Sequence, residues 1–287
     1  MDAWTIRRVL EWTAKDLASR DIPSARLDAE VLLAHVLGTD RLGLYLDLDR
    51  PLGEDERGAF RDVIARRRRR EPVAYLTGTR EFWSLPLLVT PDVLIPRPET
   101  ETLVEAALDL LPAGSVGARA VDVGTGSGCV ALALATERPG LRVLAVDIDR
   151  GAAAVAARNA RALGLTGAVG VVAGDLLGPV GGPVDLVVAN LPYVPTREID
   201  GLEPEISRWE PRRALDGGDD GLDVFRRLLS AAAEVVRAGG NLALEVSHDE
   251  QAAQLVALIG AGGAWEPARS RRDYGGVARV VVAARRA

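Results

Sequence analysis

The sequence predicts an α/β fold in which a mostly parallel sheet follows a small helical domain. From residue 100 onward, short apolar runs alternate with helical stretches, as in a sheet covered by helices on both faces. Before residue 79, apolar residues recur at helical spacing instead. Between residues 82 and 95, alternation punctuated by two prolines indicates a β-hairpin. We therefore expect a helical domain over residues 1–78, and a hairpin connector with an α/β domain over residues 79–287.

The helical pattern of the first domain is carried by apolar residues three or four positions apart. Ser24 stands where it would cap the second helix, and Gly38 stands where it would end that helix. The residues that define the expected apolar faces are Val9, Leu10, Thr13, Leu27, Val31, Ala34, Leu33, Leu37, Phe60 and Ile64.

The composition is that of an ordinary globular protein. The 287 residues are 48% hydrophobic and 26% charged, and the length suits about two domains. No apolar run approaches the ~20 residues of a membrane span, and no signal-type apolar segment follows Met1. The single cysteine, Cys129, excludes an internal disulfide and a cysteine-based zinc site. We predict no metal, no membrane contact and a cytoplasmic location.

The formal net charge of -6 argues against a nucleic-acid backbone as the main partner, because phosphate contacts need a basic surface. One segment departs from this balance, since residues 66–70 are five consecutive arginines, Arg66 to Arg70. The commoner explanation of such a run is the solvated end of a helix, where cations favour the negative end of the dipole. The alternative is a contact with ribosomal RNA or with an acidic partner surface.

A glycine-rich loop lies between a predicted strand, residues 120–123, and a predicted buried helix that begins near residue 130. Glycines allow positive φ and close approach of the backbone to a ligand, and the N–H groups at a helix start attract polar or negative atoms. A dinucleotide fingerprint would need a third glycine where Cys129 stands, so the spacing disfavours a nicotinamide cofactor. A plain structural turn would show the same glycines. The predicted cofactor loop consists of Gly124, Thr125, Gly126, Ser127 and Gly128.

Acidic residues stand at the ends of successive predicted strands, where ligands of open α/β sheets bind. Asp147, about twenty residues past the glycines, is placed to accept hydrogen bonds from two ribose hydroxyls, a role that Asp149 could share. Asp175 is placed to accept a hydrogen bond from an adenine amine. Each aspartate alone is explained as well by a helix cap or a turn. Three in succession favour a cofactor site, to which we also assign the adjoining Ile148 and Leu176.

A second loop, residues 190–193, follows a fourth predicted strand on the same side of the sheet. The side-chain oxygen of Asn190 and the carbonyl of Leu191 can each accept an N–H, so together they can hold a planar NH2 group by its two hydrogens. The ring of Tyr193 can cover that group. A strand-ending turn is the alternative, since asparagine and proline are ordinary turn residues. The predicted substrate residues are Asn190, Leu191, Pro192 and Tyr193.

The glycine loop, Asp147 and the Asn-Leu-Pro-Tyr sequence of residues 190–193 resemble the S-adenosylmethionine-dependent methyltransferases that modify amide or exocyclic amine nitrogens. More narrowly, the chain is similar to the release-factor glutamine methyltransferases. The most specific supporting segment is Pro-Arg-Pro-Glu-Thr-Glu at residues 96–101. Further support comes from residues 80–82, 159–160, 202–205, 210–211, 214–215 and 220–222.

This resemblance implies a Rossmann-like class I methyltransferase domain with seven strands, of which the last is antiparallel. It implies S-adenosyl-L-methionine as the cofactor, and a glutamine in the Gly-Gly-Gln loop of peptide chain release factors as the methyl acceptor. The helical domain is then expected to help position the release factor. Asp122, also at a strand end, is expected to support the amino group of the cofactor's methionine part.

The chain departs from the family pattern at Leu191, where the family usually has a proline. Leucine keeps the carbonyl, but it frees φ and adds a backbone donor. Asn-Leu-Pro-Tyr is also similar to loops of adenine-modifying RNA dimethyltransferases, so an RNA or DNA adenine-amine methyltransferase is the alternative. A non-catalytic binding module is disfavoured by the intact glycines, Asp147 and Asn190.

The stretch from residue 191 to residue 220 contains four prolines and little periodicity. A connection that long is usually functional or disordered. Beside the second loop, it is expected to form a wall for a peptide substrate. Its acidic residues Glu203, Glu205 and Glu210 are expected to be solvated or to meet a basic loop of a partner.

Overall fold

The structure is a computed structural model that describes residues 4–111, 114 and 117–287. The chain divides into two compact units. The first contains the residues up to Thr79 together with residues 203–209, and the second contains residues 80–202 and 210–287. No helix of the described residues has the length and apolar character needed to cross a membrane.

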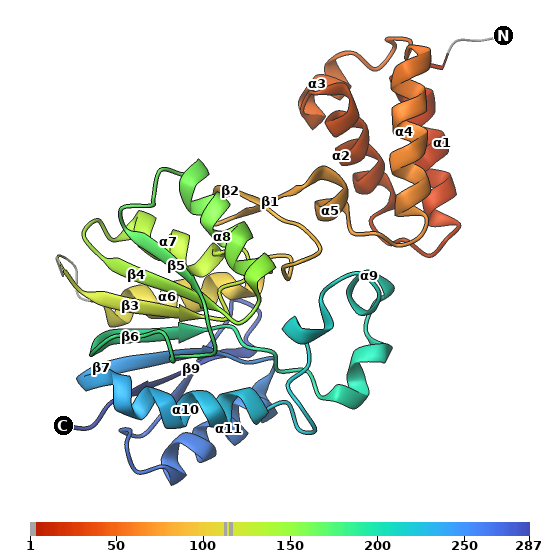
Figure 1. The fold of residues 1–287 in the computed structure, drawn as a ribbon. Coiled ribbons are helices and arrows are strands. Elements are labelled where there is room, and N and C mark those ends of the chain that lie inside the picture. The colour runs from red at the N-terminus through yellow and green to blue at the C-terminus, as the bar shows by residue number, and fades with distance from the viewer. Residues whose placement is uncertain (1–3, 112–113, 115–116) are drawn as a thin grey trace. The chain divides into compact units, whose positions relative to one another are not determined.

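The first unit is helical. It contains α1 (Ile6–Ala18), α2 (Ala25–Leu37), α3 (Arg41–Leu46), α4 (Glu54–Arg67), α5 (Val73–Thr77) and the short α9 (Pro204–Ser207), which comes from the second half of the chain (Figure 1). Gly38 ends α2 in the left-handed conformation with φ of 65°, as predicted. Ser24 occupies the N-cap position of α2, but its side chain makes no capping hydrogen bond.

The apolar face expected for α2 is correct only in part. Leu33 and Ala34 are buried as predicted, whereas Leu27 is exposed and Val31 and Leu37 are half-buried. Ala29 and Leu32, which were not expected on this face, are fully buried in the core of this unit. Apolar residues lie all around this helix, so periodicity alone does not select the face that packs.

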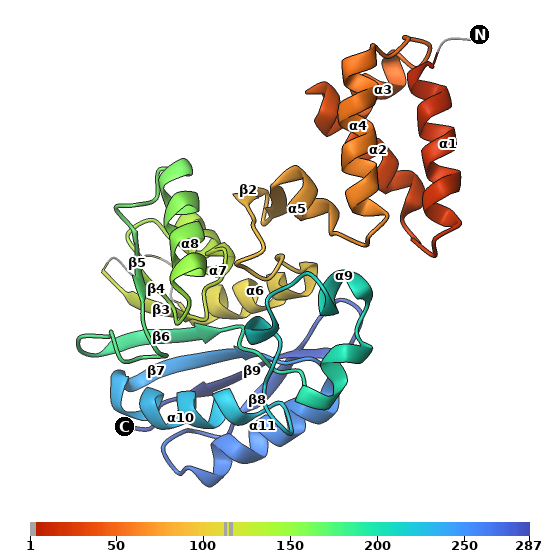
Figure 2. The ribbon, with the colours of Figure 1, turned by 45° about the vertical axis from the view of Figure 1, so that its right-hand side comes forward.

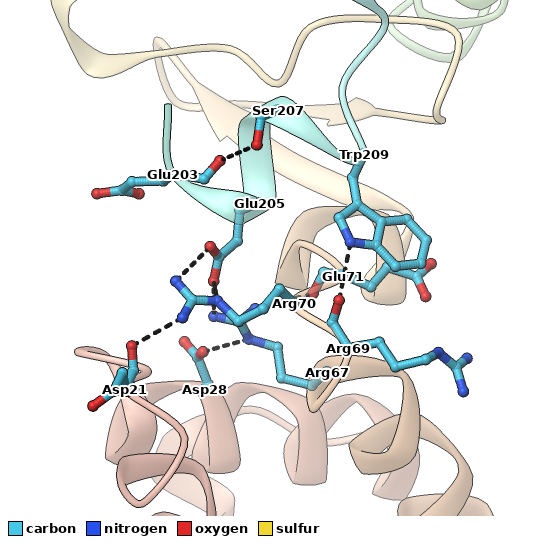
Figure 3. A network of polar contacts seen from close by, with 10 residues as sticks. All are labelled: Asp21, Asp28, Arg67, Arg69, Arg70, Glu71, Glu203, Glu205, Ser207 and Trp209. Atoms are coloured by element: carbon cyan, nitrogen blue, oxygen red, sulfur yellow. Dashed lines mark hydrogen bonds and ion pairs between the residues drawn. The ribbon is translucent and has the colours of Figure 1, made fainter. Parts of the chain in front are cut away.

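The arginine run is tied into the helical unit by its own side chains and backbone, as Figure 3 shows. Arg67, only 4% exposed, contacts Asp28 at 2.7 Å and Glu205 at 2.8 Å. Arg70 forms two hydrogen bonds of 2.7 Å with the same Glu205 carboxylate. Arg67 and Arg70 are therefore not solvated, contrary to the explanation favoured from the sequence. The reason is that residues 203–209 bring a carboxylate to them from more than 130 positions away.

The second unit is built on a seven-stranded sheet in the order β5-β4-β3-β6-β7-β9-β8. Strands β3 to β7 pair in parallel, while β9 is antiparallel to both β7 and β8. The expected α/β class with seven strands, the last antiparallel, is confirmed. The strands are β3 (Arg119–Val123), β4 (Arg142–Asp147), β5 (Val169–Ala173), β6 (Val184–Ala189), β7 (Val236–Glu245), β8 (Arg269–Arg272) and β9 (Ala278–Ala284).

Helices cover both faces of this sheet (Figures 1 and 2). On one face, α6 (Glu101–Leu110) and α7 (Cys129–Glu137) share a core with Ala120 and Val143. On the other, α10 (Asp223–Val235) and α11 (Asp249–Ala261) share a core with Val121 and Val123. Helix α8 (Arg150–Ala162) packs on β4 and β5. Consecutive residues of β3 thus point to opposite faces, both buried, which explains its continuous apolar run.

Two element boundaries differ from the prediction. The hairpin is formed by β1 (Thr79–Phe82) and β2 (Leu85–Leu88), so it lies earlier than expected and residues 89–95 are not part of it. Its turn residues Trp83 and Ser84 both have positive φ, which suits a two-residue hairpin turn even without glycine. The sequence also predicts a helix from Leu222 to Arg237 that is closed by Gly239 and Gly240. The observed α10 ends at Val235 instead, because the chain enters β7 at Val236 and pairs there with β6.

The proline-rich stretch from residue 191 to residue 220 is largely irregular, as expected. It contains the short helices η2 (Thr196–Gly201), α9 and η3 (Arg212–Ala214). Two of its acidic residues are neither solvated nor available to a partner. Glu205 binds Arg67 and Arg70 in the helical unit, and Glu210 is 6% exposed and bound to Arg97 in the second unit.

Candidate active site

The sheet order places the two predicted loops next to each other. From β3 the chain moves outward through β4 to β5, and it then returns to place β6 on the other side of β3. The crevice beside such a reversal of strand order is where open α/β sheets bind ligands. The glycine loop leaves β3 and residues 190–193 leave β6, so both lie at this crevice. A pocket there is lined by residues of both loops.

The glycine loop has the backbone that its composition predicts. Gly124, Gly126 and Gly128 have φ values of 71°, 54° and 85°, a region that strongly favours glycine. Gly128 also directly precedes α7, where an added Cβ would lie 3.2 Å from the Ala156 side chain. The amides of Gly124 and Thr125 donate to the Val146 carbonyl, which fixes the loop against the end of β4.

Asn159 attaches the glycine loop to the hairpin. This side chain is 2% exposed, and its amide nitrogen donates to the Ser127 carbonyl at 2.8 Å and to the Leu88 carbonyl at 3.0 Å. Its oxygen accepts the Leu88 amide hydrogen at 2.8 Å. The position of the loop therefore depends on α8 and β2 as well as on β3.

Asp122 and Asp147 both line the pocket and both contact the glycine loop. Asp122 accepts from the Thr125 hydroxyl at 2.6 Å and from the Ala131 amide at 3.1 Å. Asp147 accepts from the Gly126 amide at 2.9 Å. Burial raises the pKa of Asp122 to about 6 and also raises the pKa of Asp147, although hydrogen bonds oppose both shifts. The buried Asp122 and the half-buried Asp147 therefore face the same pocket.

The other predicted strand-end residues line the same pocket, but they have further partners. Asp149 caps α8 by accepting the Ala152 amide hydrogen at 2.8 Å, and it pairs with Arg213. Asp175 pairs with Arg227 at 2.5 Å. The cap explanation thus accounts for Asp149, whereas Asp175 is half-exposed within reach of a ligand.

Ile148 and Leu176, the residues that follow two of these carboxylates, also line the pocket. Ile148 is 65% exposed, which is unusual for isoleucine, and Leu176 has a positive φ of 48°. An exposed apolar side chain at the mouth of a pocket can cover a flat apolar ligand.

In the second loop, Asn190, Leu191 and Pro192 line the pocket. Leu191 is 3% exposed and packs against the glycine loop, since a Cβ on Gly124 would lie 3.3 Å from its Cδ2 atom. Tyr193 is not in the pocket lining, and its ring packs against the core on the α10 side of the sheet. The structure thus brings the first three residues together with the glycine loop, and the stacking role of Tyr193 stays a prediction.

The sequence alone does not predict a site role for the residues that complete the pocket wall. Arg97 and Thr100, from the segment before α6, line it, and so do Arg213 and Arg227. Glu210 holds the first of these segments in place, because it accepts from the Ile95 amide at 3.2 Å and pairs with Arg97 at 2.5 Å. The only signal in the sequence was the family-like Pro-Arg-Pro-Glu-Thr-Glu segment.

The pocket retains polar groups that suit a nucleoside-bearing cofactor with a charged amino-acid part. The hydroxyl oxygen of Ser127 is buried without a hydrogen-bond partner among the described residues. Asp122 and Asp147 offer carboxylate oxygens. At Gly126 there is open space where a Cβ atom would stand. No group of three or more potential metal ligands occurs in the described part of the chain.

Comparisons with known proteins show the family to which this chain belongs. Residues 8–78 match the PrmC N-terminal domain, and residues 100–202 match the methyltransferase small domain. The release factor glutamine methyltransferase of Geobacter sulfurreducens is 46% identical over 85% of this chain and 85% of its own length. That of Moorella thermoacetica is 44% identical over 98% of this chain and 99% of its own length. The chain belongs to the release factor glutamine methyltransferase family.

Solved structures support the fold of this family member independently. The T. thermophilus 16S rRNA N2 G1207 methyltransferase, solved with AdoMet and guanosine, matches with a TM-score of 0.54 over 72% of this chain and 50% of its own. At 19% identity this likeness shows the fold alone. The sheet and its covering helices are therefore those of a methyltransferase domain.

Proposed function

We propose that this protein transfers a methyl group from S-adenosyl-L-methionine to the side-chain amide nitrogen of a glutamine, in the Gly-Gly-Gln loop of peptide chain release factors. The observation that carries the proposal is the position of Asn190. It stands at the switch point of the sheet, in a pocket shared with the glycine loop, in a chain that is 46% identical to a release factor glutamine methyltransferase.

The cofactor residues in this proposal are those that line the pocket on the β3, β4 and β5 side. Asp147 would take the ribose hydroxyls, Asp122 the methionine amino group, and Asp175 the adenine amine. Ile148 and Leu176 would cover the adenine, while the backbone from Gly124 to Gly128 approaches the cofactor closely. When bound, the cofactor supplies a methyl group that is already electrophilic because it is carried on a sulfonium.

The protein's task is then to position an amide nitrogen, which is a poor nucleophile because its lone pair is delocalised into the carbonyl. The Asn190 side-chain oxygen and the Leu191 carbonyl would accept its two hydrogens and stabilise the positive charge that develops on nitrogen. Pro192 keeps the loop stiff, and Tyr193 would cover the amide plane. Both acceptors come from one short loop that Leu191 anchors in the core.

One experiment separates this proposal from methylation of an adenine amine, the alternative kept open by the Leu191 variant. The protein is incubated with methyl-labelled cofactor and either a release factor or ribosomal RNA. Label in the release factor, lost when the glutamine of its Gly-Gly-Gln loop is replaced by alanine, supports the proposal. Label in RNA alone would overturn it. The absence of label in both would favour a binding module.

Among the described residues, the arginine run gives little support to an RNA partner. Arg66 pairs with Glu71, Arg68 pairs with Asp16, and Arg67 and Arg70 pair with Glu205. In these pairs, carboxylates neutralise most of the positive charge that phosphate contacts would need. We propose the release factor as the main partner, contact through residues 66–70 as a minor alternative, and the cytoplasm as the place of action.

Replacing Asn190 by alanine should show whether this residue positions the substrate amide or binds the cofactor. We expect kcat to fall by roughly 100-fold or more, because one of two acceptors on the reacting nitrogen is lost. Cofactor affinity, measured by calorimetry, should change by no more than a few-fold. Asn241→Ala, on β7 and outside the pocket lining, is the matched control and should keep its activity. A collapse of cofactor affinity in Asn190→Ala would contradict the role given to this residue.

A further inference from the structure

A buried carboxylate lies behind the second loop with no role in the site described so far. Glu245 is the last residue of β7, and the residue before it, Leu244, pairs with Ala189 directly before Asn190. Glu245 is 2% exposed, and its Oε2 atom has no hydrogen-bond partner among the described residues. Burying such a group is costly, so its presence calls for an explanation.

Thr100 connects this carboxylate to Asn190. It stands at the N-cap position of α6 and is 1% exposed, yet its side chain makes no capping hydrogen bond. Instead its hydroxyl oxygen accepts the Asn190 amide hydrogen, with 3.1 Å between Nδ2 and Oγ1. Thr100 also lines the pocket, whereas Glu245 lies behind it. The usual structural use of a threonine at a helix start is therefore absent here.

The protons on these three groups fix which way the Asn190 amide faces. An ionised carboxylate only accepts, and a threonine hydroxyl has one proton to give. Burial raises the pKa of the Glu245 carboxyl group, and hydrogen bonding from Thr100 and Asn190 lowers it, so both side chains act on this carboxylate. Once the Thr100 proton points to Glu245, the hydroxyl oxygen can only accept from Asn190, which places the amide nitrogen toward Thr100. The amide oxygen is then left for a ligand in the pocket.

We propose that Thr100 and Glu245 are positioning residues that present the oxygen of the Asn190 amide, rather than its nitrogen, to the methyl-accepting NH2 group. This inference rests on the proposed function, in which Asn190 binds that group. With the amide reversed, the NH2 group of Asn190 would face the NH2 group of the substrate, so two donors would oppose each other. The methyl-accepting nitrogen would then lose one of its two hydrogen-bond partners.

The charge on Glu245 gives this arrangement a pH dependence. Burial raises the pKa of Glu245 to about 7, opposed by hydrogen bonding from Thr100 and by Arg279 on β9. Glu99 raises this pKa further, and Tyr193 and Cys129 are the other titratable groups that sense Glu245. A protonated Glu245 can donate to Thr100, which frees the hydroxyl to donate to Asn190 and permits the reversed amide. The productive orientation is therefore favoured above about pH 7.

The test measures kcat with a release factor at saturating cofactor, across about pH 6 to pH 8. Thr100→Val keeps the shape and removes the hydroxyl, so we expect kcat to fall at least about tenfold, with cofactor affinity unchanged. Thr100→Ser restores the hydroxyl and should recover most of kcat. Thr102→Val changes a buried threonine inside α6 that does not line the pocket, and this variant should behave like the wild type.

Glu245→Gln separates positioning from a merely structural role. Glutamine can accept from or donate to Thr100 at any pH, so kcat should fall and its rise near pH 7 should disappear. The free energy of unfolding of this variant should not fall along with kcat. A carboxyl group whose folded pKa is raised stabilises the fold only at low pH, and this contribution is lost as the pH rises through about 7. The glutamine variant should thus be at least as stable as the wild type at pH 8.

The outcomes distinguish this inference from the proposed function. If the wild type fails to methylate a release factor, the proposed function falls, and the positioning role, which rests on it, falls as well. If the wild type is active and Thr100→Val keeps its kcat, or Glu245→Gln keeps the wild-type pH profile, the positioning role is overturned while the proposed function stands.

Discussion

Asp122 is 2% exposed on β3, and burial raises its pKa to about 6. A carboxyl group whose folded pKa is raised stabilises the fold below its unfolded pKa, and this contribution is lost as the pH rises through about 6. At neutral pH, the ionised Asp122 therefore costs stability. Its hydrogen bonds with Thr125 and Ala131 offset part of this cost, and a cation bound beside it, the role proposed for the cofactor's amino group, would offset more.

Asp122→Asn should therefore weaken cofactor binding and stabilise the free protein at neutral pH. In the wild type, affinity should fall as the pH drops through about 6 and Asp122 becomes protonated. In the variant, affinity should be at least about tenfold lower at pH 7.5 and nearly flat with pH. Calorimetric titration from about pH 5 to pH 8 measures both effects. A variant with the affinity and pH dependence of the wild type would exclude Asp122 from the amino-group site.

At the scale of helices, Arg67 links the end of α4 to Asp28 in α2, and both side chains are less than a tenth exposed. Removing one partner of a buried ion pair typically costs about 3–5 kcal/mol when the other charge is left uncompensated. Because Arg67 keeps its pair with Glu205, we expect Asp28→Ala to lose stability toward the lower end of this range in denaturant-induced unfolding. Asp16→Ala breaks a more exposed pair with Arg68 and should cost no more than about 1 kcal/mol. Equal losses in the two variants would show that burial does not set the strength of these pairs.

The elements that the sequence predicts well are those whose burial is complete. Strand β3, with both faces covered, is a continuous apolar run, and it was located within a residue of its ends. Boundaries set by pairing with distant strands were not predictable. Gly239 and Gly240 are typical of a helix end, but they lie within β7, which pairs with β6 both before them, at Val236, and after them, at Asn241.

The residues of the candidate site also divide into those that the sequence predicts and those that it does not. Residues at strand ends, such as Asp147 and Asn190, were assigned from the sequence because parallel strands bring their carboxyl ends to one edge. Thr100 and Arg97 were not assigned, because they lie in a segment without periodicity. Their contacts to Asn190 and Glu210 span 90 and 113 positions in the chain. Such side-chain pairs depend on the folded geometry and leave no spacing to recognise.

At the scale of the whole molecule, the segment that follows the second loop belongs in part to the helical unit. Residues 203–209 leave the methyltransferase unit, bind Arg67 and Arg70 through Glu205, and return at Glu210 (Figure 3). The Trp209 indole adds a hydrogen bond of 3.2 Å to the Arg69 carbonyl. The helical unit therefore holds part of the stretch expected to face a peptide.

Glu205→Ala should release this segment. Although burial opposes it, hydrogen bonding from Arg70 and Arg67 holds the pKa of Glu205 below its usual range. These bonds contribute stability above the unfolded pKa, and the contribution is lost as the pH falls through the folded pKa. We expect trypsin to cleave after Arg208 several-fold faster at neutral pH, as judged by mass spectrometry. Glu203→Ala, an exposed acid of the same segment, is the control. Equal cleavage rates in both variants would show that Glu205 does not hold the segment.

The contact between Gly124 and Leu191 has a consequence for how this protein can change. A Cβ at position 124 would stand 3.3 Å from the leucine side chain and 3.6 Å from the Asn190 carbonyl oxygen. Substitutions on the two sides of this contact should therefore be non-additive. Any lineage that replaces residue 191 must do so while position 124, with its positive φ, remains glycine. The range of side chains open to position 191 is thus limited from across the crevice.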